Sequence, residues 1–127
     1  MSTPYRVLVT GSREWDDLPT IREALRQVRN EDTTKPIVVV HGDCPRGADA
    51  IAAFLTRRAT ADFQMADEPH PADWKQYGKR AGFIRNAHMV NLGADICLAF
   101  IKDGSRGASH TAQLAEAAGI PTRRWTA

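Results

Sequence analysis

Strand-like apolar runs alternate with helical patterns along the whole chain of 127 residues. Runs with the composition of strands cover residues 5–10, 37–40, 63–66, 96–101 and 120–125. The second run, Ile-Val-Val-Val, has no polar alternation, which is typical of a strand buried on both faces of a sheet. Regular alternation of this kind predicts one α/β domain over residues 1–127. We expect a doubly wound, mostly parallel five-stranded sheet with helices on both faces.

Four stretches between these runs carry apolar residues at helix spacing. The first follows Asp17, a predicted N-cap, and the second begins at about Ala48. The third spans about 79–92, and the last ends before Gly119. Residues 67–77, with two prolines and two aromatics, are expected to form a loop. The residues expected on buried helix faces are Ile21, Ala24, Leu25, Val28, Ile51, Phe54, Leu55, Thr111, Leu114, Ala115 and Ala118.

Composition excludes several classes of protein. The chain is 43% hydrophobic and 25% charged, which is ordinary for a globular protein, and no apolar run approaches the roughly 20 residues of a membrane-spanning helix. Residues 1–5 lead straight into the first strand, so we expect no signal peptide and a cytoplasmic location, in the host cytoplasm if a phage encodes the chain. Cys44 and Cys97 lack metal-ligand spacing, so we expect no metal site and no required cofactor. A net charge of +2 permits an anionic ligand and makes nucleic acid an unlikely partner.

Three glycine-containing turns follow predicted strands. They read Gly-Ser-Arg at 11–13, His-Gly-Asp at 41–43 continuing to Arg-Gly-Ala-Asp at 46–49, and Asp-Gly-Ser-Arg-Gly at 103–107. Ligands of doubly wound sheets bind beyond the carboxyl ends of the strands, where glycine allows close approach and helix N-termini attract phosphate. Neither GxGxxG nor GxxxxGK[ST] occurs, so a dinucleotide dehydrogenase and a P-loop NTPase are not supported.

Four segments together resemble the YspA, cpYpsA-related family of the SLOG superfamily. They are Val-Thr-Gly-Ser-Arg-Glu-Trp at 9–15, His-Gly-Asp-Cys-Pro-Arg-Gly-Ala-Asp at 41–49, Ala-Gly-Phe-Ile-Arg-Asn-Ala-His-Met at 81–89 and Gly-Ser-Arg-Gly-Ala-Ser-His-Thr-Ala at 104–112. The resemblance covers nearly the whole chain. It implies a Rossmann-like fold with a pocket for nucleotides or nucleotide-derived ligands, in a superfamily that also contains the LOG phosphoribohydrolases and DprA.

The comparison with LOG enzymes bears on catalysis. In those enzymes an arginine in an RKxxM helix and a glutamate closing a GGxGTxxE loop hydrolyse an N-glycosidic bond. Arg85 falls on that arginine, whereas Thr111 stands where the glutamate would be. Cleavage of a ribosyl bond needs a carboxylate, so LOG-type hydrolysis does not carry over. If the chain is an enzyme, the candidates for catalysis are Arg85, Asp43 and Asp49.

Several residues have alternative roles that the sequence leaves open. Trp15 either stacks on a base or covers the first helix, and Asp49 either binds a ribose hydroxyl or caps the second helix. Asp43 and His41 are an acid–base pair or simple turn and core residues. Trp74, Tyr77, Lys79 and Arg80 either close over a nucleotide, support an oligomer contact or pack back on the sheet. The expected ligand-binding residues are Gly11, Ser12, Arg13, Trp15, Gly42, Asp43, Gly47, Asp49, Arg85, Asn86, Gly104, Ser105, Arg106, Gly107, Ser109 and Thr111.

Three functional hypotheses follow, in order of preference. The first is a module that binds a nucleotide or nucleotide-derived ligand as a sensor, carrier or sequestering protein. The second is a hydrolase that cleaves N-glycosidic or phosphate bonds of nucleotides, and the third is DprA-like binding of single-stranded DNA. Relatives often form dimers or larger assemblies, so a homo-oligomer is an open alternative; a membrane partner is not expected.

Overall fold

The computed structural model describes residues 3–32 and 34–127 and contains one five-stranded sheet. Its strand order is β3-β2-β1-β4-β5, and all neighbouring strands are parallel, which confirms the predicted fold class. Met1 and Ser2, on which the expectation of no signal peptide partly rests, lie outside the described residues. The strands are β1 (Tyr5–Gly11), β2 (Ile37–His41), β3 (Met65–Pro69), β4 (Ile96–Ile101) and β5 (Thr122–Thr126).

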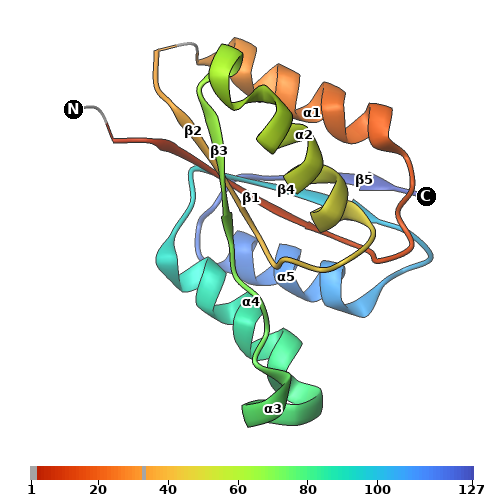
Figure 1. The fold of residues 1–127 in the computed structure, drawn as a ribbon. Coiled ribbons are helices and arrows are strands. Elements are labelled where there is room, and N and C mark those ends of the chain that lie inside the picture. Colours follow the sequence, from red (N-terminus) through yellow and green to blue (C-terminus); the bar gives the residue numbers. More distant parts are fainter. Residues whose placement is uncertain (1–2, 33) are drawn as a thin grey trace.

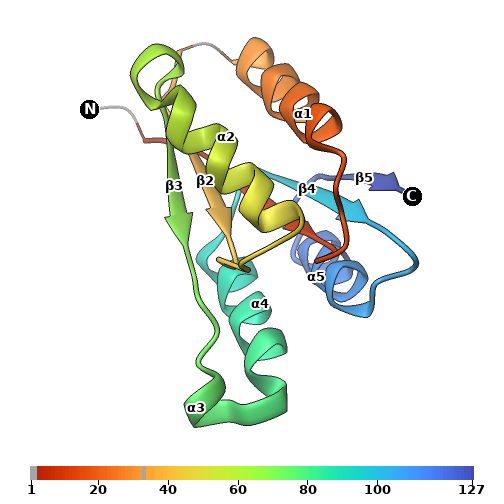
Figure 2. The same cartoon turned by 45° about the vertical axis from the view of Figure 1, so that its right-hand side comes forward.

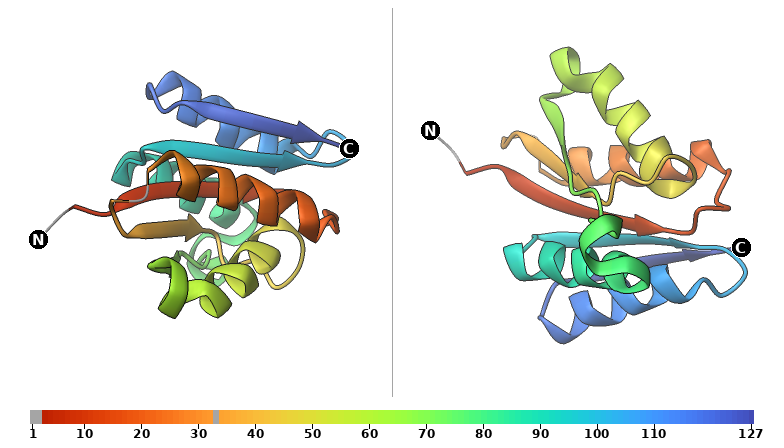
Figure 3. Two further views of the ribbon diagram at one scale, coloured as in Figure 1. Left: turned by 90° about the horizontal axis from the view of Figure 1, so that it is seen from above. Right: turned by 60° about the horizontal axis from the view of Figure 1, so that its bottom comes forward.

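Helices cover both faces of the sheet (Figure 1). One face carries α1 (Leu18–Glu31) and α2 (Ala48–Phe63), and the other carries α4 (Ala81–Leu92) and α5 (Arg106–Ala117), as the two views in Figure 3 show. A short helix α3 (Trp74–Tyr77) and a 3-10 turn η1 (Gly78–Arg80) join β3 to α4 at the far end of α4 (Figure 2). From β1 the chain adds β2 and then β3 on one side, and it then returns to add β4 and β5 on the other side of β1. The strand order therefore reverses between β1 and β4.

The two central strands form the core. Every residue of β4 is buried, and Val7, Leu8 and Val9 of β1 have no exposed surface. Val7 and Val9 pack in the cluster under α1 and α2, whereas Leu8 packs in the cluster under α4 and α5. Alternate side chains of β1 therefore serve the two helical layers.

The first helix confirms its sequence prediction. Asp17 is its N-cap and accepts a 3.1 Å hydrogen bond from the backbone N–H of Thr20. The four residues expected to be buried in α1 are the buried ones: Ile21, Ala24, Leu25 and Val28.

Two residues expected on buried helix faces are exposed. Phe54 of α2 is 51% exposed, whereas Ala48, Ile51, Ala52 and Leu55 of the same helix pack in the core. Only the start of α2 lies very close to β1: a Cβ added at Gly11 would lie 2.2 Å from the Cβ of Ala48. Ala118 is also exposed, because α5 ends at Ala117.

The prediction of a loop over residues 67–77 is wrong at both ends. The strand β3 spans Met65–Pro69, whereas residues 63–66 were predicted. It starts later than predicted because α2 continues through Phe63, and it extends to Pro69. Its acidic residues are tolerated on an edge strand because Asp67 and Glu68 are ion-paired with basic side chains. At the other end, Asp73 caps α3 and accepts a hydrogen bond from the N–H of Gln76.

Among the helices that the structure describes, none combines the length and the apolar character that crossing a membrane requires.

Candidate functional site

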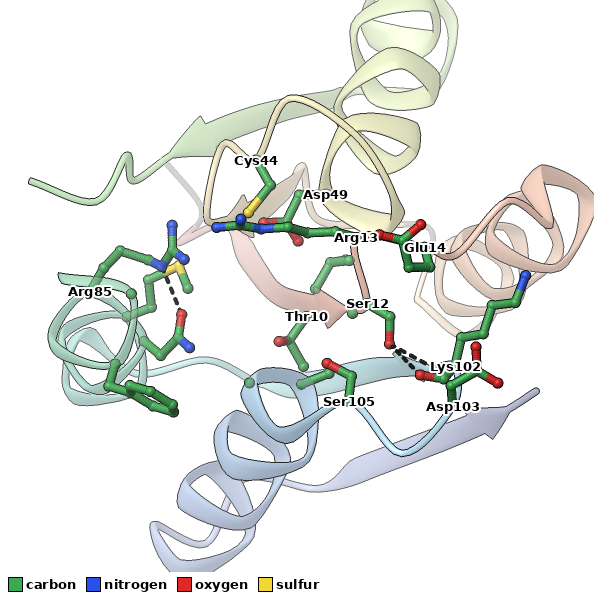
Figure 4. A pocket seen from close by; sticks show the side chains of 18 of the residues that line it. Thr10, Ser12, Arg13, Glu14, Cys44, Asp49, Arg85, Lys102, Asp103 and Ser105 are labelled. Carbon is green, nitrogen blue, oxygen red and sulfur yellow. Dashed lines mark hydrogen bonds between the residues drawn. The ribbon is translucent and has the colours of Figure 1, made fainter. Parts of the chain in front are cut away.

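A cavity of about 460 Å³ opens beside the carboxyl ends of β1 and β4, at the point where the strand order reverses (Figure 4). This is where doubly wound sheets bind ligands, and the volume is within the range of about 300–1,000 Å³ of small-molecule sites. Its walls come from the end of β1, from the loops after β1, β2 and β4, and from α2, α3, η1, α4 and α5. Of the residues expected to bind the ligand, those that line the cavity are Gly11, Ser12, Arg13, Asp49, Arg85, Asn86, Ser105 and Gly107.

Ser12 joins the loops after the two central strands. Its hydroxyl accepts a 2.7 Å hydrogen bond from the N–H of Lys102 and lies 3.3 Å from the carbonyl oxygen of the same residue. Its backbone N–H donates to the carbonyl of Phe100 in β4. The polar groups of Ser12 are therefore used to hold the floor of the cavity together.

Two glycines outside the cavity wall allow the loops to approach one another. Gly47 has φ +81°, and a Cβ there would lie 2.4 Å from the carbonyl oxygen of Ser12. A Cβ at Gly42 would lie 2.6 Å from Nη1 of Arg85 and 2.9 Å from Oδ2 of Asp49. Both glycines are needed because neighbouring protein atoms approach their Cα atoms closely. They support the cavity wall and do not line the cavity.

Arg85 is fixed by acceptors on three segments. Its Nε donates to Oδ1 of Asn86 at 2.7 Å, and its Nη1 donates to the carbonyl oxygens of Gly42 and, at 3.3 Å, of His70. Asn86 therefore helps to orient the Arg85 guanidinium. The described hydrogen-bond partners of the guanidinium are thus an amide and carbonyls, and Arg85 lines the cavity.

Asp49 places a carboxylate at the cavity wall with little exposed surface. It lies in the first turn of α2, one residue past the helix start, and Oδ2 accepts a 3.1 Å hydrogen bond from the N–H of Gly42. Gly47 is the N-cap instead, so Asp49 does not cap the helix. Burial raises the pKa of Asp49 above its ordinary value, although a hydrogen bond from Cys44 and the charge of Arg85 oppose the rise.

His41 and Asp43 do not form an acid–base pair. His41 has no exposed surface, and its Nδ1 accepts a 3.0 Å hydrogen bond from the backbone N–H of Asp43. Its Nε2 is then the protonated nitrogen and donates to Oδ2 of Asp67 at 2.8 Å. Asp43, at φ +55°, does not line the cavity. The hydrogen bonds of His41 to Asp43 and Asp67 therefore hold the loop after β2 in place.

The start of α5 faces the cavity. Ser105 is its N-cap but makes no side-chain capping hydrogen bond, unlike Asp17 at α1, so the first N–H groups of α5 are not satisfied by its N-cap side chain. Ser105, Gly107 and Ala108 line the cavity around this helix end. The α5 N-terminus therefore offers free backbone donors and a positive dipole end to a bound anion.

The other residues predicted to bind ligand lie away from the cavity. Trp15 is buried, its ring 5.5 Å from that of Phe100, so it is part of the core. Thr111 is fully buried, and its hydroxyl donates to the carbonyl of Gly107 within α5. The remaining residues of the prediction that do not line the cavity are Gly104, Arg106 and Ser109.

Several cavity residues were not in the sequence prediction. Lys102 directly follows the end of β4, a position that the strand-end rule could have identified. Phe83 reaches the cavity because α4 covers this face of the sheet, which no local sequence pattern shows. Trp74 and Lys79 belong to the aromatic–basic segment, and the structure places these two at the cavity, but not Tyr77 or Arg80.

Among the residues that the structure describes, no group of three or more His, Cys, Asp or Glu side chains is arranged to hold a metal ion.

Comparison with known proteins gives a family. The model of the YspA, cpYpsA-related SLOG family matches residues 5–77. Gene 61 protein of Mycobacterium phage D29 is 44% identical over 117 residues, which is 91% of this chain and 92% of that protein. No solved structure matches. The chain therefore belongs to the YspA, cpYpsA-related SLOG family.

Proposed function

We propose that the protein binds a nucleotide or nucleotide-derived ligand in the cavity between β1 and β4. Membership of the SLOG family suggests a nucleotide-related function. The observation that carries the proposal is the meeting of Arg13, Arg85 and the uncapped start of α5 around one cavity. Guanidinium groups and helix N-termini are the groups that proteins use to hold phosphate.

The charge of the cavity supports an anionic ligand. Four cationic side chains line it, Arg13, Lys79, Arg85 and Lys102, against three carboxylates. One of those carboxylates, Glu14, is ion-paired with Arg46 outside the cavity, and another, Asp49, is buried with a raised pKa. Lys102 is 3.6 Å from Asp16, but Arg13 has no carboxylate partner in the described part of the chain. The balance at the cavity favours negative charge on the ligand.

Titration calorimetry with AMP, ADP-ribose and 3′,5′-cyclic AMP tests the proposal. We expect saturable binding of at least one of them. Because charged hydrogen bonds contribute about 1.5–3 kcal/mol, Arg85→Ala and Arg13→Ala should each weaken that binding about ten-fold or more. Arg22→Ala, which removes an exposed arginine on α1 outside the cavity, is the matched control and should change nothing. Undiminished binding in both cavity variants would contradict the assignment of the site.

A second candidate function is hydrolysis of the bound nucleotide, and Asp49 is the observation that favours it. A buried carboxyl with a raised pKa is the kind of group that acts as a general acid or base near neutral pH. Thr111, at the position of the LOG glutamate, donates its hydroxyl to its own helix and leaves Asp49 as the candidate. Incubation with the same nucleotides, followed by chromatography for free base or phosphate, separates the two functions: binding without products supports a binding module alone.

A further inference from the structure

Trp74 presents a large aromatic surface at the cavity wall. It begins α3, lines the cavity and is 49% exposed. In the described structure the ring is partly covered by Arg13, whose guanidinium carbon lies 5.7 Å from the ring centroid. The aromatic ring and the arginine without a carboxylate partner therefore meet on the same side of the cavity.

The ring also lies next to the second cavity arginine. Gly82 of α4 leaves room between them: a Cβ added there would lie 3.4 Å from Cη2 of Trp74 and 3.8 Å from Nη2 of Arg85. Because Gly82 has no side chain, nothing on this helical position separates the indole from the guanidinium. A ligand that touches Arg85 is thus within reach of the indole.

The other exposed aromatic side chains nearby are less suited to contact a ligand. Tyr77 follows on the same short helix and is 39% exposed, but it does not line the cavity. Phe83 lines the cavity, but its ring is engaged edge-on with His110 at 5.2 Å between centroids. Trp74 is thus the exposed aromatic side chain best placed to offer a ring face.

We propose that Trp74 stacks on the base of the bound nucleotide, and that Arg13 moves from the indole to an anionic group of the ligand. This inference rests on the proposed function and specifies its ligand: one that carries an aromatic base, as opposed to a sugar phosphate alone. An exposed cation–π contact is weak, whereas an arginine–phosphate pair is charge-assisted, so the exchange of partners by Arg13 is favourable. A base on an aromatic side chain gains affinity of about ten-fold or more.

The test compares the tightest nucleotide of the calorimetric panel with ribose 5-phosphate. The wild type should bind the nucleotide at least ten-fold more tightly than ribose 5-phosphate. Trp74→Leu should weaken nucleotide binding about ten-fold and leave ribose 5-phosphate binding unchanged, whereas Trp74→Phe should retain most of the affinity. Tyr77→Leu, on the same helix outside the cavity, is the control and should bind both probes as the wild type does.

Indole fluorescence gives an independent readout. Nucleotide binding should quench the emission of the wild type, and the quenching should disappear in Trp74→Phe, which keeps Trp15 and Trp125. Thermal unfolding of Trp74→Leu checks that the variant is folded.

The failures of the two proposals are distinguishable. If ribose 5-phosphate binds as tightly as the nucleotide, or if Trp74→Leu weakens both probes equally, the role of Trp74 in base recognition is overturned while the cavity remains a phosphate-binding site. If the wild type binds no nucleotide of the panel, the proposed function fails and this inference fails with it.

Discussion

The guanidinium of Arg85 lies directly over the Cα of Gly42. Nη1 donates to the Gly42 carbonyl, and a Cβ added at Gly42 would lie 2.6 Å from Nη1 and 2.7 Å from Cζ. Distances below 3.0 Å are essentially absent between real Cβ atoms and their neighbours. The absence of a side chain at Gly42, just after β2, therefore allows the guanidinium of Arg85 on α4 to take this position.

Gly42→Ala is expected to displace the Arg85 guanidinium and weaken ligand binding about ten-fold. The added methyl group also comes within 2.9 Å of Oδ2 of Asp49, and because both side chains can move at the expense of their hydrogen bonds, we expect a loss of about 1 kcal/mol in the free energy of unfolding. Calorimetry with the tightest nucleotide and urea unfolding measure the two effects.

A double-mutant cycle shows whether the clash with Arg85 is the cause. In an Arg85→Ala background the guanidinium is gone, so Gly42→Ala should cost clearly less stability than it does in the wild type. Additive losses in the two variants would contradict the close contact between these residues.

Gly107→Ala is expected to have opposite effects on stability and binding. Gly107 lies in α5, at the cavity wall, and a Cβ there would meet no atom within 4 Å. Alanine in place of glycine within a helix stabilises it by up to about 1 kcal/mol. The same methyl group enters the cavity beside the free N–H groups of α5, so nucleotide affinity should fall. Thermal unfolding and calorimetry of one variant check both signs; unchanged affinity would argue against a ligand at this helix end.

The sequence predicted the fold well because the signals that determine it are local. The uninterrupted apolar run of β2, the N-cap at Asp17 and the apolar stripe of α1 each reflect the burial of one segment. The predictions failed where contacts with residues distant in the sequence determine burial or strand bounds. Phe54 is exposed because α2 turns Ala48, Ala52 and Leu55 towards the sheet and Phe54 lies off that face. The strand β3 accepts Asp67 and Glu68 because arginines from other segments pair with them.

The lining of the cavity was predicted as far as the strand ends determine it. Gly11, Arg13 and Ser105 follow from the rule that loops after parallel strands meet at one edge. The same rule does not distinguish a glycine that faces a ligand from one that makes room for a neighbour, such as Gly42 or Gly47. Nor does it show that Trp15 turns into the core while Trp74, far along the chain, turns to the cavity.

Glu68→Gln is expected to lower the free energy of unfolding at pH 7 by about 1 kcal/mol. Hydrogen bonds of 3.0 and 2.9 Å from Arg6, with a further one from His70, lower the pKa of Glu68 from 4.5 to about 2. A pKa shift of this size corresponds to a larger stabilisation free energy than about 1 kcal/mol. The Glu68 side chain is 36% exposed, however, so solvent screens much of the interaction with Arg6 and His70.

The pH dependence of this variant follows from the direction of the shift. The charged form of Glu68 stabilises the folded state fully above pH 4.5, and that contribution is lost as the pH falls from 4.5 towards 2. Urea unfolding should therefore show a larger difference from the wild type at pH 8 than at pH 3.5. Glu23→Gln is the control, because Glu23 is exposed and lies 3.9 Å from Arg26, and it should behave as the wild type.

Asp49→Asn is expected to raise the melting temperature, in contrast to Glu68→Gln. Burial raises the pKa of Asp49 in the folded state, so the folded protein holds this proton more tightly than the unfolded chain does. The charged carboxylate then costs stability at high pH, and the cost fades as the pH falls through the folded pKa towards the unfolded value of 3.8. Asparagine carries no charge, and its Oδ1 can still accept the hydrogen bond from the N–H of Gly42, although its amide group replaces the carboxylate oxygen available to Cys44, which reduces the gain.

The gain of Asp49→Asn should therefore be largest at pH 8 and shrink at pH 4.5, as measured by thermal unfolding at both values. Asp103→Asn is a matched control, because Asp103 lines the same cavity but is exposed, and its φ of +53° suits asparagine. That variant should stay within about 0.5 kcal/mol of the wild type. A loss of stability in Asp49→Asn that grows with pH would mean that the carboxylate is stabilised by positive charge, and that Arg85 acts on Asp49 more strongly than burial does.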